Sequence, residues 1–564
     1  MKTTHFFIFC ISLSLSMSTH SQVYQWAMDA GGTLDDEIFD MTHDAAGNIY
    51  VTGIFEGTAD LDPGPSVASF TVNGEGDMFF AKFDADGNYL WAKAVGSIGD
   101  EEGQGIELDA DGYIYLTGLY SDVADFDPGA GTYDLTSNGG FDIYIAKYDN
   151  DGNFMWAGSI GDYGAGDDCP SKMTIDSDAN IYVTGQFDGT ADFDPGAGTA
   201  DLVSTGGWDI FFAKYDSSGS YTWAKSIENS TNADDYGYNI AVDATQNVYV
   251  TGQYDGTCDF DPGIGTASLT SVGNLDAFFA KYDIDGNYVW ANSIGGTADD
   301  AGNCIALDGS GNVFVAGYFT GTVDFDAGAG TSNLSSAGAE DIFYMKYDND
   351  GNYTWAKNTG GSDTDVANWL TFDASGNIFL TGQFSLTADF DPDAGTANSS
   401  SAGSWDIFFA KYNSDGSYNW SASVGGIGVD QSHVIDYVSA GNFLIAGEFP
   451  NSVDFDPNTG TATLSSFGLD DIFFAKYYDG NVGIEKSDAF SKPEFFPNPV
   501  SNLLNISVAR DADMKLFDAA GQEVGHLNLG SGTSTIDFSY LRQGVYVAVI
   551  QCGAERTLDK IIVR

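Results

Sequence analysis

Three short motifs recur seven times along this chain at a nearly constant spacing. A tryptophan, usually followed by alanine, recurs every 65 or 67 residues. A lysine before an aromatic residue and a glycine that usually follows threonine recur with it. The series are Trp26, Trp91, Trp156, Trp223, Trp290, Trp355 and Trp420; Lys82, Lys147, Lys214, Lys281, Lys346, Lys411 and Lys476; and Gly53, Gly118, Gly185, Gly252, Gly317, Gly382 and Gly447. Such a period indicates structural repeats that bury their hydrophobic faces against one another.

Each period predicts four β-strands. In the second repeat the expected strands are 105–109, 113–120, 142–148 and 154–159. Turns of Asp, Asn and Gly join the first pair and the last pair, and these residues tolerate tight hairpins. The third strand is apolar on both faces, which is typical of a strand covered on both sides. Four antiparallel strands repeated seven times predict an all-β fold with a seven-bladed β-propeller.

The two ends of the repeat region complement each other. The first tryptophan strand, 23–28, has no lysine strand before it, and the last lysine strand, 472–477, has no tryptophan strand after it. We therefore expect the N-terminal strand to complete the seventh blade as its outermost strand and so close the ring. An open β-solenoid is the alternative, but it does not need complementary ends.

The chain begins with features of a secretory signal. Met1 and Lys2 precede an apolar run over 6–17, which is too short to span a bilayer, and small residues follow. The alternative is an N-terminal strand or anchor helix. The sequence predicts four parts: a signal peptide over 1–21, the propeller over 22–479, a linker over 480–492 and a C-terminal domain over 493–564. We expect no transmembrane segment.

The charge is extreme and unevenly distributed. The chain has 82 Asp and Glu against 20 Lys and Arg, a formal net charge of −62. This balance excludes nucleic-acid binding, which needs a basic surface, and argues against docking on an anionic membrane. From Ile484 onward there are 10 acidic and 8 basic residues, so the preceding part holds 72 acidic and 12 basic residues, a net of −60. Disorder is excluded, because 43% of the residues are hydrophobic and 14% aromatic.

The repeat unit resembles a known family. The segments VYVTGQYDGT, DFDPG, FFAKYDIDGNYVWA and GGTADD are similar to the SBBP-type β-propeller repeat of bacterial extracellular proteins, over about 23–479. The resemblance implies a propeller fold. It implies no single activity, and a fold does not determine a function.

The C-terminal part predicts a small β-sandwich, with short alternating strands over 503–508, 514–517, 534–538, 544–550 and 558–563. It also resembles the C-terminal sorting domain of the type IX secretion system of Bacteroidota. The residues that carry the resemblance include Pro497, Asn498, Pro499, Gly521, Gly544, Tyr546 and Lys560. The resemblance implies that the type IX machinery exports the protein, removes this domain, and releases the protein or attaches it to the cell surface. The alternative is a purely structural appended domain.

Acidic residues gather in two kinds of loop that the strand order places on one face. One kind carries Asp-x-Asp pairs: Asp60 and Asp62, Asp125 and Asp127, Asp192 and Asp194, Asp259 and Asp261, Asp324 and Asp326, Asp389 and Asp391, and Asp454 and Asp456. The other carries acidic pairs such as Asp35-Asp36 and Asp100-Glu101. Hard oxygen ligands suit Ca²⁺, so the Asp-x-Asp residues are candidate calcium ligands. Turn chemistry is the alternative, and we favour it, because turns select such residues anyway.

The repeated lysines and tryptophans predict a scaffold role. A lysine stem can pack while its ammonium group reaches a carboxylate, so we expect each repeat lysine to pair with a repeat aspartate. The tryptophans are expected to pack between blades, with sugar stacking as the alternative.

No catalytic constellation is visible in the sequence. Only His43 and His433 lie in the repeat region, and no nucleophile motif, zinc pattern or phosphate-binding loop accompanies them. The leading hypothesis is a secreted or surface-attached monomer that binds a glycan or protein ligand without catalysis. The alternative is a polysaccharide hydrolase or lyase that uses two central carboxylates. Two carboxylates with a raised pKa in one deep cleft of the propeller's central channel would favour the hydrolase or lyase hypothesis.

Overall fold

The computed structural model describes residues 22–164 and 166–480 and, further on, 494–496, 500, 503–508, 512–518, 522–529, 532–552 and 555–564. The chain divides into two compact units, 1–480 and 481–564. The expected signal peptide and residues 481–492 of the expected linker lie outside the described residues. Every regular element within the described parts is a β-strand, which confirms the all-β prediction.

The first unit consists of groups of four antiparallel strands. In order from the first to the fourth strand, the groups are β2 (Asp36–His43), β3 (Ile49–Asp60), β4 (Ser69–Phe83) and β5 (Tyr89–Val95); β6 (Glu101–Leu108), β7 (Ile114–Tyr120), β10 (Asp142–Tyr148) and β11 (Phe154–Asp162); β12 (Cys169–Ile175), β13 (Ile181–Phe187), β16 (Asp209–Tyr215) and β17 (Tyr221–Asn229); β18 (Tyr236–Val242), β19 (Val248–Tyr254), β22 (Asp276–Tyr282) and β23 (Tyr288–Ile294); β24 (Ala301–Leu307), β25 (Val313–Asp324), β26 (Asn333–Tyr347) and β27 (Tyr353–Gly361); β28 (Asp365–Phe372), β29 (Ile378–Asp389), β30 (Asn398–Tyr412) and β31 (Tyr418–Val424); and β32 (Gln431–Ser439), β33 (Asn442–Asp454), β34 (Thr463–Tyr478) and β1 (Val23–Ala30).

In three groups the loop between the second and third strands contains a short strand pair, and two of these pairs are hydrogen-bonded to the fourth strand of the preceding group. The three pairs are β8 (Val123–Asp125) with β9 (Asp134–Thr136), β14 (Thr190–Asp192) with β15 (Asp201–Val203), and β20 (Thr257–Asp259) with β21 (Ser268–Thr270). In the other groups the long second and third strands pair over the same stretch.

The observed strands of the second group test the sequence prediction. The third strand, β10, has the predicted bounds, and every residue in it is buried. The first strand, β6, begins at Glu101, four residues earlier than expected. Glu101 is buried and pairs with Tyr120, so the ladder extends into what the sequence suggested was a loop.

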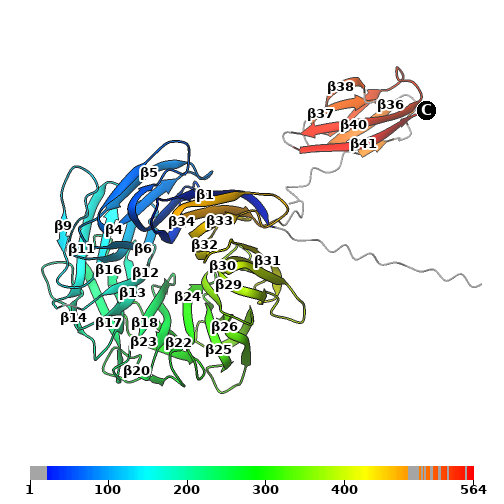
Figure 1. The fold of residues 1–564 in the computed structure, drawn as a ribbon. Helices are drawn as coiled ribbons and strands as arrows, with labels where there is room; N and C mark the ends of the chain where they lie inside the picture. Colours follow the sequence, from blue (N-terminus) through cyan, green and yellow to red (C-terminus); the bar gives the residue numbers. More distant parts are fainter. Residues whose placement is uncertain are drawn as a thin grey trace, which may run out of the picture. The chain divides into compact units, whose positions relative to one another are not determined.

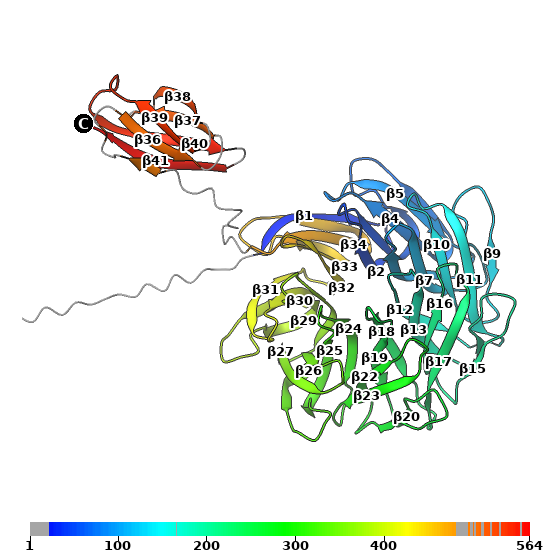
Figure 2. The same cartoon turned by 180° about the vertical axis from the view of Figure 1, so that it is seen from behind.

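The N-terminal strand joins the far end of the repeat region. β1 pairs antiparallel with β34, with Ala27 opposite Ala475, which is the pairing that the complementary ends predicted. The first strands of neighbouring groups also pack side by side, from β2 through β6, β12, β18, β24 and β28 to β32, and β32 packs beside β2. Figures 1 and 2 show these strands around the centre of the first unit.

The hydrophobic core lies between neighbouring groups. Tyr50 and Phe80 of the first group belong to one buried cluster with Leu116 and Tyr148 of the second. Trp91 packs against this shared cluster, and its ring meets the edge of Phe80 with centroids 5.7 Å apart. The predicted packing role is therefore confirmed at this position.

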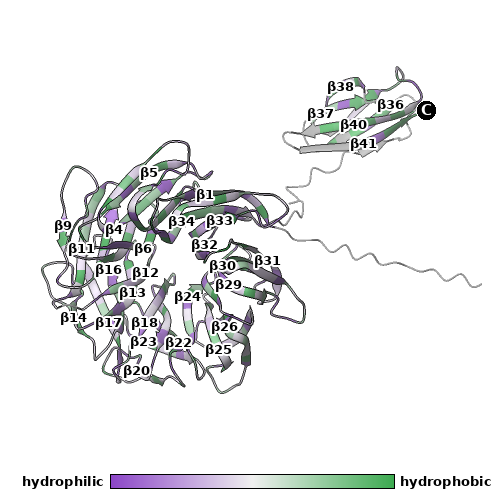
Figure 3. Cartoon of the chain, in the orientation of Figure 1, coloured by the Kyte–Doolittle hydropathy of each residue, from purple (hydrophilic) through white to green (hydrophobic). Residues whose placement is uncertain are grey.

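Hydrophilic residues occur on the innermost strands, for example on β18 and β24 (Figure 3). In the second and fourth groups, by contrast, every residue of the second and third strands is buried. A functional site with polar side chains is therefore expected on the first strands, at the centre of the unit.

The second unit has two sheets around a shared core. One sheet holds β35 (Glu494–Phe496), β36 (Leu503–Val508) and β39 (Gly532–Asp537), and the other holds β38 (Glu523–Leu529), β37 (Ala512–Phe517), β40 (Gly544–Cys552) and β41 (Glu555–Val563). Leu504 and Ile506 of the first sheet pack in one cluster with Met514, Ile550 and Ile561 of the second.

Candidate functional site

The innermost strand of every group carries a β-bulge at the same place. A register shift at this place leaves one residue unpaired in each of these strands, and β32 has a second shift further along. The unpaired residues are Phe39, Gln104, Ser171, Tyr238, Asn303, Asn368 and His433. Bulges re-aim side chains and are common beside functional sites. The fold is repetitive, but the residues at this position are of six different types, and only Asn303 and Asn368 are alike.

Most of these residues line one cavity of about 290 Å³ at the centre of the first unit, here called the channel site. Its lining is Phe39, Gln104, Lys172, Tyr238, Asn303, Asn368, Trp369 and His433. A concave site with aromatic walls and a few polar groups is the usual form of a small-ligand site.

Aromatic rings dominate the walls of the channel site. Phe39 meets the His433 ring with centroids 6.1 Å apart. Tyr238 stacks on Tyr236 at 6.0 Å, and Trp208 meets Tyr236 edge-on at 5.7 Å. The rings of Tyr238, Tyr236 and Trp208 thus form a row that starts at the channel site, and Trp208 is not one of the seven repeated tryptophans.

One lysine supplies the positive charge of the channel site. Lys172 Nζ donates to the Phe39 carbonyl oxygen at 2.7 Å, lies 3.4 Å from Asp40 Oδ1, and sits 4.9 Å from the centroid of the Trp369 ring. A cation–π contact of this kind fixes both the ammonium group and the indole ring. Lys172 and Trp369 are thus fixed in position in the wall of the channel site.

His433 is held by a carboxylate. Its Nε2 lies 2.6 Å from Glu448 Oε2. Burial lowers the pKa of His433, but Glu448 raises it by more, so the net shift is upward. Burial and the nearby Glu448 also raise the pKa of Glu37 to about 7.

The first strands also line a second cavity of about 300 Å³, and three carboxylates belong to its lining. Asp40 pairs with Lys172, and Asp436 Oδ2 lies 2.5 Å from His43 Nδ1. The third is Glu107, whose pKa is raised to about 8 by burial first and then by Asp40 and Asp436. The channel therefore contains the kind of carboxylate that would suit an acid catalyst.

The first aspartate of each Asp-x-Asp pair organises its own loop. Asp60 Oδ1 accepts the backbone N–H groups of Asp62 at 3.2 Å and Ala68 at 2.7 Å. The equivalent Asp125, Asp192, Asp259, Asp324, Asp389 and Asp454 accept the same two N–H groups, two and eight residues further on. Side-chain bonds of this kind to nearby backbone N–H groups stabilise turns.

The second aspartate of each pair holds the next turn. Asp62, Asp127, Asp194, Asp261, Asp326, Asp391 and Asp456 each accept the N–H group two residues further on. Gly131 lies so close to the Asp127 carboxylate that a Cβ there would be 2.0 Å from Oδ2. Within the described residues no group of three or more His, Cys, Asp or Glu side chains is arranged to hold a metal ion. Calcium binding by these loops stays a prediction.

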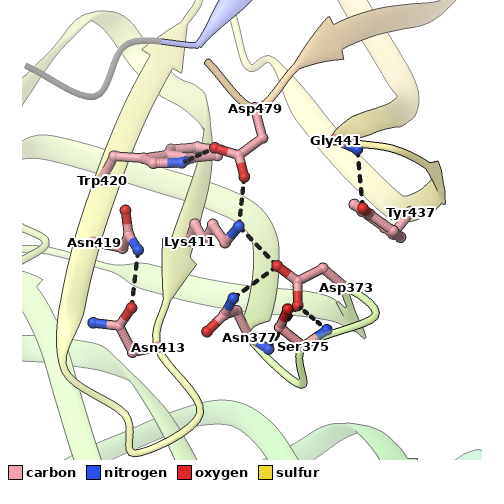
Figure 4. A network of polar contacts seen from close by, with 10 residues as sticks. All are labelled: Asp373, Ser375, Asn377, Lys411, Asn413, Asn419, Trp420, Tyr437, Gly441 and Asp479. Atoms are coloured by element: carbon pink, nitrogen blue, oxygen red, sulfur yellow. Dashed lines mark hydrogen bonds and ion pairs between the residues drawn. The ribbon is translucent and has the colours of Figure 1, made fainter. Parts of the chain in front are cut away.

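The repeat lysines lie over aromatic rings and reach toward a neighbouring turn. The predicted pairing with a repeat aspartate is found for Lys147 with Asp109, Lys346 with Asp308 and Lys411 with Asp373. The other four donate instead to Asn150, Gln246, Asn349 and the Ala85 carbonyl oxygen. Figure 4 shows Lys411 between Asp373 and Asp479, with the Trp420 Nε1–H donating to Asp479.

The sorting residues fall in the second unit. Pro497, Asn498, Pro499 and Gly521 lie outside the described residues. Gly544 begins β40, Tyr546 donates its hydroxyl to the Arg542 carbonyl oxygen at 2.9 Å, and Lys560 lies on β41 opposite Val547.

Two family models match segments of the chain. Residues 494–564 match the family described as the secretion system C-terminal sorting domain. Residues 223–253 match the β-propeller repeat family SBBP. The chain carries a type IX sorting domain and SBBP-type propeller repeats. The sorting domain directs export by type IX secretion to the cell surface or the extracellular space. Among the described residues no helix is long and apolar enough to cross a membrane.

Two curated proteins are similar in sequence. An uncharacterized WD repeat-containing protein of Acanthamoeba polyphaga mimivirus is 26% identical over 507 residues, covering 75% of this chain and 36% of that protein. The regulatory protein FlaEY of Caulobacter vibrioides is 29% identical over 144 residues, covering 26% of this chain and 15% of that protein. The chain thus spans about a third of the first relative's length and less of the second's.

Solved structures give weak likenesses. PorZ, described as an essential bacterial surface component of the type-IX secretion system of Porphyromonas gingivalis, is 12% identical and has a TM-score of 0.24; the match covers 93% of this chain and 81% of PorZ. A protein of unknown function from Bacteroides thetaiotaomicron is 10% identical with a TM-score of 0.23, covering 81% of this chain and 99% of that protein. Likenesses of this size carry no functional argument.

The channel site could not be predicted from repeated residues, because the bulge residues share a position in the strand but mostly not a residue type. Aligning the seven first strands does not reveal the bulge, because the neighbouring position varies as well: it is Asp40, Gly105, Lys172, Asn239, Cys304, Trp369 or Val434.

Proposed function

We propose that the exported unit is a seven-bladed β-propeller, closed by β1, that binds a glycan at the channel site without catalysis. The pairing of β1 with β34 and the packing of β32 beside β2 support closure. The single observation that carries the binding function is the set of varied bulge residues around one cavity. The boundaries 1–21, 22–479, 480–492 and 493–564, a monomeric state and a partnership of the C-terminal domain with the secretion machinery belong to the same proposal.

The chemistry of the channel site favours a sugar over a peptide. Sugar rings have apolar C–H faces that pack on aromatic rings such as Phe39 and Tyr238, while amides and charged groups such as Gln104 and Lys172 can bond the hydroxyl groups. A cavity of about 290 Å³ is of the size that takes a small ligand or the end of a chain.

A glycan array with the full-length protein tests this function, followed by titration of the best glycan. We expect Tyr238→Ala to weaken binding about 10-fold, which corresponds to about 1.4 kcal/mol. Tyr163→Ala is the matched control, because Tyr163 is 58% exposed and does not line the channel site. Equal losses in both variants, or binding of peptides alone, would contradict the proposal.

Glu107 favours a second candidate, a polysaccharide hydrolase or lyase. Two of the three carboxylates that line the second cavity are engaged in ion pairs with Lys172 and His43, which leaves Glu107 as the candidate acid. If the protein binds without catalysis, glycans recovered after long incubation are intact and Glu107→Gln binds them as tightly as the unchanged protein. Cleavage that is lost in Glu107→Gln would establish the enzyme instead.

A further inference from the structure

Each group begins with a fully buried acid. These residues are Asp36, Glu101, Asp168, Asp235, Asp300, Asp365 and Asp430, and all are 0% exposed. The sequence analysis placed several of them in acidic loops on one face. The structure shows that the second acid of each such pair turns inward.

A second acid lies near each of these residues, on the third strand of the preceding group. These residues are Asp471, Asp77, Asp142, Asp209, Asp276, Asp341 and Asp406, in the same order, and none is more than 4% exposed. Oδ1 has no hydrogen bond of normal geometry in six of them: Asp142, Asp209, Asp276, Asp341, Asp406 and Asp471. Weaker donors lie near the carboxyl groups of all but Asp471, for example Ser159 near Asp142 and Asn358 near Asp341. Buried polar atoms without partners are rare in folded proteins and need an explanation.

The two carboxylates of a pair face each other closely. A Cβ built on Gly31 would lie 2.8 Å from both Asp36 Oδ2 and Asp471 Oδ1, so these oxygens are at most twice that distance apart. Gly360 stands in the same relation to Asp341 Oδ1 and Asp365 Oδ2, at 2.9 Å each. In both pairs the oxygen without a partner points toward the neighbouring acid.

Backbone donors satisfy only part of each pair. Asp36 accepts the N–H groups of Gly32 at 2.5 Å and Glu56 at 3.2 Å, and Asp471 Oδ2 accepts that of Phe467 at 2.8 Å. Among the described ion pairs none brings a lysine, arginine or histidine to either acid. Two buried like charges without a counter-ion are costly.

We propose that a calcium ion bridges the two buried carboxylates of each pair. Two carboxylates supply a charge that balances Ca²⁺, and backbone carbonyls of the surrounding loops can complete its shell, since Ca²⁺ accepts irregular oxygen ligands at 2.3–2.6 Å. Two oxygens bound to one such ion can be up to about 5 Å apart, and the upper limit on the separation of the facing oxygens lies close to this value. Mg²⁺ fits less well, because it demands a regular octahedron and gives up water reluctantly. This proposal is independent of the glycan function.

Metal analysis and melting of the full-length protein test the calcium sites. After treatment with EGTA and dialysis against Ca²⁺ at pH 7.5, we expect roughly seven bound ions per chain and a higher melting temperature than in EGTA. Asp471→Asn should bind one ion fewer, and its new amide can donate to Asp36, so the fold should survive. Asp341→Asn tests a second pair in the same way.

The matched control is Asp456→Asn, which changes an Asp-x-Asp loop in the same group as Asp471. It should bind as many ions as the unchanged protein. No bound calcium, or a loss of calcium in Asp456→Asn but not in Asp471→Asn, would overturn the proposal. A melting temperature that responds to protons and not to Ca²⁺ at pH 7.5 would overturn it too, because protons would then neutralise the pairs.

Discussion

At the scale of single residues, Lys411 carries the clearest stability prediction. It is 3% exposed, its Nζ lies 2.8 Å from Asp373 Oδ2 and 2.5 Å from Asp479 Oδ2, and it covers the Phe379 ring. Replacing it with methionine leaves two buried carboxylates without their cation, so we expect Lys411→Met to lose about 3–5 kcal/mol of unfolding free energy. Lys281→Met is the control, because Lys281 donates to the neutral Asn349 and should lose clearly less. Urea unfolding of both variants decides; equal losses would show that the charge pairing contributes nothing.

A proline explains one irregularity among the buried acids. Asp300 Oδ1 accepts the N–H of Thr320 at 2.8 Å, but the residue at the equivalent place beside Asp430 is Pro450, which has no N–H. Asp430 Oδ1 accordingly has no partner. We expect Pro450→Thr to stabilise the protein by about 1 kcal/mol, since a bond to a charged acceptor gains more than the extra chain entropy costs. The reciprocal Thr320→Pro should destabilise it. A fall in melting temperature for Pro450→Thr would contradict this account.

At the scale of elements, β1 is the strand whose position in the sequence and position in the sheet differ most. It pairs with β34 although more than 400 residues separate them. A permuted chain that moves 23–30 to follow 478, joined by a copy of the turn 149–153, should fold with an unfolding free energy within about 1 kcal/mol of the original, because the same ladder forms locally. Deleting 23–30 exposes an edge of β34 and should cost far more. If the permuted chain is as unstable as the deletion variant, the contribution of β1 to stability depends on its covalent connection to β2 and not only on its pairing with β34.

The strands themselves were largely predictable, because local sequence patterns determine where they begin and end. β10 and β36 have the predicted bounds because hydrophobic patterns and turn residues define both ends. The bulges were not predictable from one repeat, since Gln104 and Tyr238 look like ordinary strand residues. The inward turn of Glu101 was missed for a similar reason: an acid beside another acid suggests a solvated loop, and only the tertiary structure buries it.

At the scale of the whole molecule, the buried acids should make stability fall as the pH rises. Burial is the first cause that raises the pKa of Asp36, Asp300, Asp365 and Asp430 to about 7, and that of Asp168 to about 8, against an ordinary value of 3.8. Between pH 4 and 7 the folded chain therefore holds more protons than the unfolded chain. Stability then decreases with rising pH across that window.

This dependence is measurable as melting temperature against pH. In EGTA we expect the protein to melt on the order of 5 °C higher at pH 5 than at pH 7.5. Below pH 4 the trend should reverse, because hairpin aspartates such as Asp44 and Asp243 have a lowered pKa in the folded chain. Burial alone would raise the pKa of these aspartates, but hydrogen bonds, chiefly those from Asn48 and Asn247, lower it by more. Their contribution is present above their ordinary pKa and is lost as they are protonated. A melting temperature that rises from pH 5 to pH 7.5 in EGTA would contradict this prediction, because it would show that the buried acids are charged in the folded chain without a loss of stability. Some other group would then have to neutralise the negative charge of the buried acids.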